Sequence, residues 1–268
     1  MQREGGNAFP LDPTRALPDC CSMFPIRDHN PSRATPYVTY FLIIANVAVF
    51  LYGLTALQTN MAERQFLFDY AMIPLRITQG DGYLGLVSHM FLHGGWMHIA
   101  GNMLFLYVFG DNLEEELGHF GFGLFYLGCG CAAAYAQYAT DPDSVIPMVG
   151  ASGAIAGVMG GYLLLFPRAK VDVLVFLLVF IRVIPIPAFI VLGLWFGLQV
   201  LNGIGADPTG GGVAYWAHAG GFVAGLLATV PVWLRRGGPQ FWDRTHGHPP
   251  HPETNYTQVR SRIPQVRR

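Results

Sequence analysis

The chain has 268 residues, of which 52% are hydrophobic and only 12% are charged, whereas soluble domains carry roughly 25% charged residues. This composition and a mean hydropathy of +0.35 exclude an ordinary soluble domain and indicate a membrane protein. The formal net charge is −1, so nothing in the charge indicates a nucleic acid partner.

The two ends of the chain are polar. Residues 1–36 are rich in proline and contain no apolar stretch followed by a small-residue cleavage site, so we expect a cytoplasmic N-terminal segment and no signal peptide. Residues 236–268 hold too few apolar side chains to fold alone, which predicts a disordered cytoplasmic tail. His246, His248 and His251 in this tail are expected to be solvated rather than to bind metal.

Between the ends lie six apolar stretches of about the length that a bilayer core of roughly 30 Å requires. They cover residues 37–57, 95–114, 120–140, 151–166, 184–204 and 213–234. They predict an all-α polytopic membrane protein, a bundle of six transmembrane helices over residues 37–235. The fourth stretch is short, so we expect its start to lie below the membrane surface.

Residues 167–183 mix charges with apolar side chains, which fits either an interfacial segment or a longer, tilted fifth helix. With the N-terminus inside, only Arg64 and Arg76 among the 16 lysines and arginines fall on the outer side. The positive-inside rule therefore places both termini in the cytoplasm. Arginine predominates strongly over lysine, which favours a GC-rich bacterial genome, and we expect a bacterial plasma membrane.

Four polar residues share one depth in this topology, just below the outer face. His98 and Asn102 open the second stretch, Ser152 opens the fourth, and His218 lies near the start of the sixth. Polar side chains are costly in a membrane and usually face the bundle interior, so their convergence predicts a site.

Small residues follow Ser152 and His218 at helical spacing and would let the two helices approach closely. Those after Ser152 are Ala156 and Gly160, and those after His218 are Gly221 and Gly225. The pattern predicts that the serine and the histidine lie within hydrogen-bond reach. The alternative is that these stripes only pack helices and that Ser152 only caps one.

A serine hydroxyl needs an adjacent base to become a nucleophile, and histidine is the usual base. The acidic residues near these helices all fall on the cytoplasmic side, so we predict a dyad of Ser152 and His218 without an acid. Acyl transfer also needs donors for the oxyanion. His98, Asn102 and the Ser152 N–H are the candidates.

Three motifs carry a resemblance to a known family: HMFLHGGWMHIAGN at 89–102, GASG at 150–153 and AHAGG at 217–221. They resemble the signatures of rhomboid intramembrane serine proteases. The segments PIRDHNP at 25–31 and GDNLEEELG at 110–118 are also similar, so the likeness covers about residues 24–235.

The resemblance implies that Ser152 attacks the scissile carbonyl, His218 is the base, and His98 and Asn102 stabilise the oxyanion. It implies that Glu114 holds helix ends together on the cytoplasmic side. It also implies single-span membrane proteins as substrates in the lipid bilayer, cut near the outer face, with no metal or cofactor. The sequence indicates no oligomeric state.

Two departures from the family are visible. Residues 58–94 lack the Trp-Arg pair often found in the first outer loop, and Ala156 stands where some members have a tyrosine that packs on the catalytic histidine. Orientation of His218 must then come from other neighbours; Tyr162 is one candidate, and the alternative is that no residue takes over this role.

Three other functions compete with a serine protease. The first is a metal enzyme using His89, His93 and His98, which is disfavoured because there is no His-Glu-x-x-His motif. The second is a non-enzymatic relative that binds membrane helices, since fold alone does not define function. The third is a transporter, for which we find neither charges at the midplane nor an inverted repeat.

Overall fold

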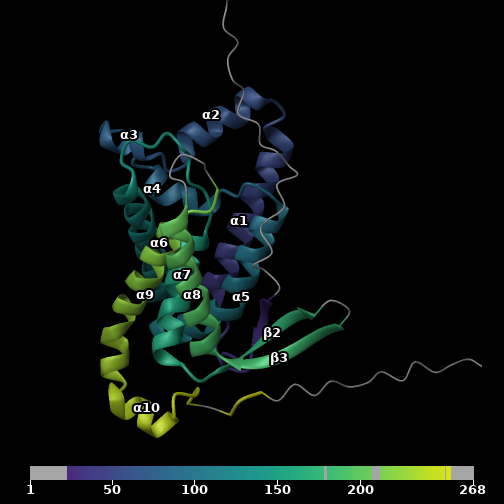
Figure 1. Ribbon diagram of the computed structural model, residues 1–268, viewed down its shortest axis with the longest axis vertical. Coiled ribbons are helices and arrows are strands. Elements are labelled where there is room, and N and C mark those ends of the chain that lie inside the picture. The colour runs from purple at the N-terminus through teal and green to yellow at the C-terminus, as the bar shows by residue number, and fades with distance from the viewer. Residues whose placement is uncertain (1–22, 178–179, 207–211, 251, 255–268) are drawn as a thin grey trace, which may run out of the picture.

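The computed structural model describes residues 23–177, 180–206, 212–250 and 252–254, and for residues 23–24 and 175–181 it describes the backbone alone. Six long helices in these ranges form a bundle (Figure 1): α1 (Tyr37–Ala56), α5 (Trp96–Leu117), α6 (His119–Thr140), α7 (Ser152–Leu165), α8 (Ala188–Gly205) and α9 (Tyr215–Arg235). They coincide within a few residues with the six predicted stretches, and the mostly helical class is confirmed. By length and composition, α1, α8 and α9 are suited to cross a membrane, and α7 is a shorter apolar helix.

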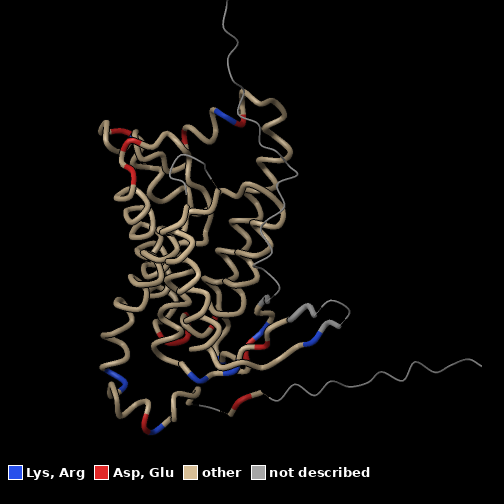
Figure 2. Tube along the Cα trace, in the orientation of Figure 1, with Lys and Arg blue, Asp and Glu red and all other residues tan. Residues whose placement is uncertain are grey.

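Charged side chains lie at the two ends of the bundle, and the middle of the described helices carries none (Figure 2). This distribution suits a bilayer, because charges in the hydrocarbon region are costly. One end carries the short helices α2 (Asn60–Tyr70), α3 (Pro74–Thr78) and α4 (Gly85–Ser88) and the 3₁₀ turn η1 (His89–Phe91). We call it the loop end, and we call the opposite end, which carries a β-sheet, the sheet end (Figure 1).

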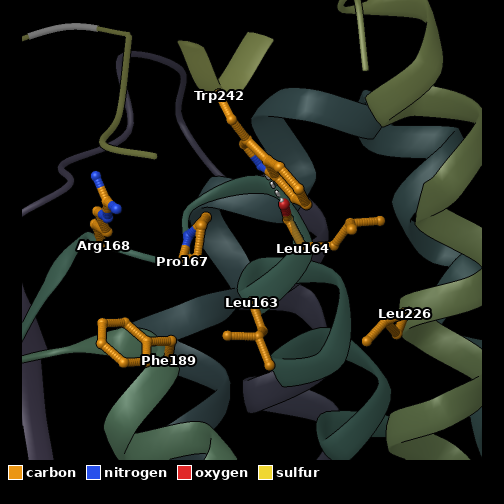
Figure 3. Close-up of a pocket in the computed structure, with 7 residues that line it drawn as sticks. All are labelled: Leu163, Leu164, Pro167, Arg168, Phe189, Leu226 and Trp242. Carbon is orange, nitrogen blue, oxygen red and sulfur yellow. Dashed lines mark hydrogen bonds between the residues drawn. The ribbon is translucent and has the colours of Figure 1, made fainter. Parts of the chain in front are cut away.

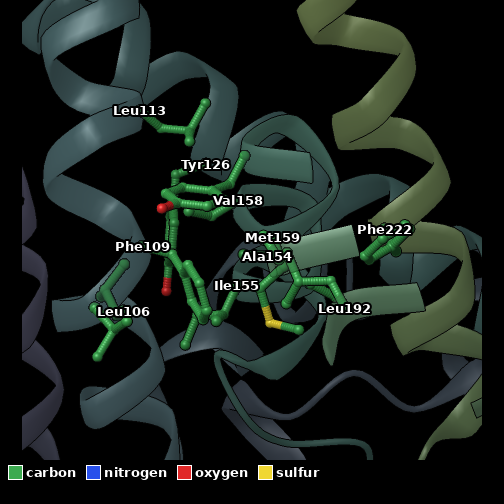
Figure 4. Close-up of a cluster of buried hydrophobic side chains, with 14 of the residues drawn as sticks. Leu106, Phe109, Leu113, Tyr126, Ala154, Ile155, Val158, Met159, Leu192 and Phe222 are labelled. Carbon is green, nitrogen blue, oxygen red and sulfur yellow. The ribbon is translucent and has the colours of Figure 1, made fainter. Parts of the chain in front are cut away.

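The helix α7 runs through the centre of the bundle. Every residue from Gly153 to Tyr162 is buried. Large side chains of α5, α6, α8 and α9 surround it, including Phe109, Tyr126, Leu192 and Phe222 (Figure 4). The other helices therefore pack around the segment that begins with Ser152.

At the sheet end, three antiparallel strands form a sheet in the order β1 (Met23–Asp28), β2 (Lys170–Leu177) and β3 (Phe180–Pro187). Of the two alternatives for residues 167–183, the longer, tilted fifth helix is wrong, because α8 begins only at Ala188; an interfacial position of the segment stays a prediction. The segment has the β-branched, alternating pattern of strands, and the prolines of β3 disfavour a longer fifth helix. Its partner strand β1 comes from a distant part of the sequence.

Side chains reinforce the pairing of β1 with β2. Asp172 is buried, and its carboxylate lies 2.5 Å from Arg27 Nε and 2.8 Å from His29 Nε2. Burial opposes ionisation of this carboxyl, but the hydrogen bonds from His29 and Arg27 dominate and lower the pKa of Asp172. The segment before α1 is thus attached to the hairpin that precedes α8.

The predicted disordered tail is partly folded, because Pro239–Thr245 forms the helix α10. Phe241 is buried, and Trp242 Nε1 donates a 3.0 Å hydrogen bond to the carbonyl of Leu164 at the end of α7. These two aromatic side chains bury apolar area against the bundle, which the many charges and prolines of the segment did not indicate. His248 lies 2.8 Å from Glu253, while His251 and residues 255–268 lie outside the described residues.

A cavity of about 470 Å³ opens where α10 meets the ends of α7 and α8. Leu163, Phe189, Leu226 and Trp242 line it, with Arg168 at one side (Figure 3). It lies at the sheet end, on the opposite side of the bundle from the start of α7.

Candidate active site

The segment before α7 is held in place by the loop end of the bundle. Gly150 N donates a 2.9 Å hydrogen bond to the carbonyl of His89, and Met72 pairs with Met148 in a β-bridge. Gly150 has φ +125°, a backbone conformation that residues other than glycine rarely adopt. This turn sets the direction in which the chain enters α7 at Ser152.

The helices α7 and α9 touch through their backbones. A Cβ on Gly221 would lie 2.0 Å from the Gly153 carbonyl oxygen, and one on Gly225 would lie 2.0 Å from that of Gly157. A Cβ on Gly160 would likewise lie 2.2 Å from the Phe222 carbonyl oxygen. The close approach expected from the small residues is present, although Gly153 and Gly157 provide more of the α7 contact than Ala156 does.

This close packing brings the serine and the histidine together. Ser152 Oγ lies 2.7 Å from His218 Nε2, a normal hydrogen-bond distance. Both side chains are partly buried. A hydroxyl and an imidazole in this geometry can exchange a proton while the hydroxyl oxygen attacks a carbonyl.

His98 on α5 reaches the same place. A Cβ built on Gly150 would lie 2.7 Å from His98 Nε2 and 3.5 Å from Ser152 Oγ, so both side chains flank one point. The amide of Gly94 donates to His98 Nδ1 at 3.4 Å. Because a neutral imidazole carries one proton, Nδ1 as acceptor leaves an N–H at Nε2, beside Ser152.

Asn102 lies one turn after His98 on α5. It is buried, and its Nδ2 has no hydrogen-bond partner in the part of the chain that the structure describes. Leaving a buried donor unpaired costs about 1–3 kcal/mol. Such a donor is available for an oxygen that arrives during a reaction.

Two side chains of α8 contact His218, and neither was among the site residues predicted from the sequence. Gln199 Oε1 lies 2.8 Å from His218 Nδ1. The Trp195 ring lies 5.8 Å from the imidazole between centroids, with 33° between the planes. A polar residue in an otherwise apolar stretch was the available signal for Gln199.

Tyr162, the suggested neighbour of His218, has a different partner. Its hydroxyl donates a 2.8 Å hydrogen bond to Asp28 at the sheet end. Burial, together with the nearby charge of Asp111, raises the pKa of Asp28 to about 8. Tyr162 therefore joins α7 to β1 and leaves the orientation of His218 to α8.

Glu114 joins three helices at the sheet end. Its carboxylate accepts hydrogen bonds from Val38 N, Thr39 N and Thr39 Oγ1, each at 2.8 Å. His119 Nδ1 at the start of α6 lies 2.5 Å away. The carboxylate satisfies orphan donors in the first turn of α1, where the helix dipole also favours a negative charge.

Of the histidines of the rival metal site, His89 and His98 have hydrogen-bond partners in the protein, whereas both ring nitrogens of His93 are buried without one in the described part of the chain. His89 Nδ1 lies 2.8 Å from the Gly85 carbonyl, and burial lowers the pKa of His89 to about 4. His93 packs edge-on against His98, with 5.0 Å between ring centroids. These contacts attach the loop end to the start of α5.

An apolar helix bundle with a histidine-bonded serine at a helix start describes a class of multi-pass membrane proteins, and comparison identifies the family. Residues 80–235, more than half of the chain, match the Rhomboid domain. The chain belongs to the rhomboid family, which is known for intramembrane serine proteases.

Three curated relatives illustrate the similarity. Rhomboid-like protein 11, chloroplastic, of Arabidopsis thaliana is 42% identical over 26% of this chain and 25% of its own length. Rhomboid protein 1, mitochondrial, of Saccharomyces cerevisiae is 31% identical over 71% of this chain and 51% of its own. Rhomboid protease GluP of Bacillus subtilis is 32% identical over 60% of this chain and 28% of its own length. The chain spans about half the length of these relatives or less.

Proposed function

We propose that this protein is an intramembrane serine endopeptidase that cleaves transmembrane helices of substrate proteins near the outer membrane face. The observation that carries the proposal is the 2.7 Å hydrogen bond between Ser152 Oγ and His218 Nε2. Ser152 is the nucleophile and His218 the general base, in a dyad that needs neither metal nor cofactor.

The reaction follows from this geometry. Ser152 Oγ attacks the scissile carbonyl carbon while its proton passes to His218 Nε2, which gives a tetrahedral intermediate with a negative oxygen. His218 then protonates the leaving amine as the C–N bond breaks and the acyl-enzyme forms. His218 then deprotonates a water molecule that attacks the ester, and it passes this proton to Ser152 Oγ as the C–O bond breaks and the new carboxyl terminus is released.

Three donors are the candidates for stabilising the negative oxygen. They are the Nε2–H of His98, the unpaired Nδ2 of Asn102 and the backbone N–H of Ser152. The last belongs to the first turn of α7, where N–H groups lack intrahelical partners. One good oxyanion donor contributes about 3 kcal/mol to transition-state stabilisation.

The depth of the dyad fits cleavage just inside the membrane. The 14 residues of α7 extend about 21 Å, less than the roughly 30 Å of a bilayer core. We propose that all six long helices cross a bacterial plasma membrane, with both termini in the cytoplasm and the loop end outside. Ser152 then lies below the outer surface, where the small residues of a single-span substrate helix would unwind.

The test is cleavage of a fluorescently labelled single-span protein by the purified enzyme in proteoliposomes. Ser152→Ala and His218→Ala should each abolish cleavage, and chelator should leave the wild-type rate unchanged. Ser32→Ala and His248→Ala, which change the same residue types at the sheet end, are the matched controls.

Cleavage that survives in Ser152→Ala would contradict the assigned nucleophile and reopen the metal function of His89, His93 and His98. A wild-type protein that cleaves no single-span substrate and is not labelled by a fluorophosphonate would favour a non-enzymatic helix-binding relative.

A further inference from the structure

The Nδ1 atom of His218, the ring nitrogen that faces away from Ser152, has its own partner. Gln199 Oε1 lies 2.8 Å from it and comes from α8, whereas Ser152 and His218 belong to α7 and α9. Trp195, one turn earlier on α8, lies beside the same ring. One helix thus supplies both a hydrogen-bond acceptor for the imidazole and an aromatic ring beside it.

The chemistry of the amide oxygen determines the tautomer of the imidazole. Oε1 only accepts hydrogen bonds, so the proton of the neutral ring must be on Nδ1. The lone pair is then on Nε2, 2.7 Å from Ser152 Oγ, where a general base needs it. The opposite tautomer would point an N–H at the serine and could not accept its proton.

We propose that Gln199 is a positioning residue, which holds His218 in the tautomer and orientation required for proton transfer from Ser152. This inference rests on the proposed protease function and adds a third side chain to the dyad. Gln199 is neutral, so it orients the imidazole without the charge that a carboxylate would add. His98 on α5 is the other titratable side chain that faces this pair.

The position of Gln199 on α8 has a consequence for the site. Among the described residues of α8, only Ala188, Leu192 and Gly203 are buried. The middle of the helix contacts α9 mainly through rings, including Phe196 stacked on Phe222 at 4.7 Å. The Gln199 hydrogen bond therefore makes the geometry of the base depend on where α8 lies.

The decisive variant is Gln199→Met, which keeps the length and volume of the side chain but removes the strong acceptor. We expect kcat for a single-span substrate to fall roughly 10- to 100-fold with KM nearly unchanged. This is less than the roughly 10⁴-fold loss caused by a wrong tautomer in a serine protease triad, because a neutral amide contributes less than a carboxylate. Asn202→Met, an exposed position on the same helix, is the control.

Gln199→Glu tests the role without removing the hydrogen bond. A carboxylate at this place would stabilise the imidazolium, so we expect cleavage to continue and the acidic limb of its pH–rate profile to move to higher pH. A residue that only packs would leave this profile where it is. If Gln199→Met fails to fold, Gln199→Glu alone tests whether Gln199 positions His218.

The outcomes separate this inference from the proposed function. If the wild type cleaves the substrate, two results would each overturn the role of Gln199 alone. One is a Gln199→Met variant that is as active as the wild type, and the other is a folded Gln199→Glu variant whose pH–rate profile is unchanged. Absence of cleavage and of fluorophosphonate labelling at Ser152 in the wild type would overturn both.

Discussion

Replacing Glu114 by glutamine tests how the sheet end of the bundle is held together. The Glu114 carboxylate is 1% exposed and accepts three hydrogen bonds from the first turn of α1. A glutamine oxygen can serve Thr39, but its NH₂ group then faces Val38 N, which leaves a backbone donor unpaired. Leaving that donor unpaired costs about 1–3 kcal/mol of folding free energy, and losing the negative charge at the helix start costs about 0.5–1 kcal/mol. We expect Glu114→Gln to lower the free energy of unfolding by about 1.5–4 kcal/mol.

The assay is equilibrium unfolding in mixed detergent micelles, followed by tryptophan fluorescence. Glu115→Gln is the matched control, because this neighbouring carboxylate is more exposed and, among the described residues, accepts a single 3.3 Å hydrogen bond, from Arg33 N. Its free energy of unfolding should stay within about 0.5 kcal/mol of wild type. If the two variants proved equally stable, Glu114 would not stabilise the start of α1 as argued.

Three further predictions concern packing, pH and the oxyanion. Gly221→Leu should prevent native packing of α7 on α9, because its Cβ would lie 2.0 Å from the Gly153 oxygen; a folded, active variant would contradict the backbone contact. The pKa of Asp28 rises from the ordinary aspartate value of 3.8, expected in the unfolded chain, to about 8 in the folded protein, so the folded state keeps a proton that the unfolded state releases. Stability should therefore fall as pH rises from about 4 to 8, and Asp28→Asn should flatten this slope in unfolding measurements. Asn102→Ala should lower kcat about 100-fold with little change in KM; a change in KM alone would indicate a role in substrate binding.

Sequence alone was sufficient for the six long helices and for the residues that we propose as the dyad. A bilayer requires backbone groups to be satisfied within each spanning segment, so long apolar stretches mark helices reliably. The motifs around Ser152 and His218 lie at helix starts, and small residues at helical spacing indicated a close approach of those helices. These features are local in the sequence and were therefore visible in it.

Contacts between distant segments were decided only by the tertiary structure. Residues 170–177 and 180–187 form antiparallel strands, and β1, from the start of the described chain, pairs with the first of them through Arg27 and Asp172. The helix α10 packs against the end of α7, where Trp242 donates a hydrogen bond to the carbonyl of Leu164. Gln199 acquires a partner only when α8 lies beside α9. Each depends on which elements become neighbours when the apolar faces pack, and local periodicity does not encode that arrangement.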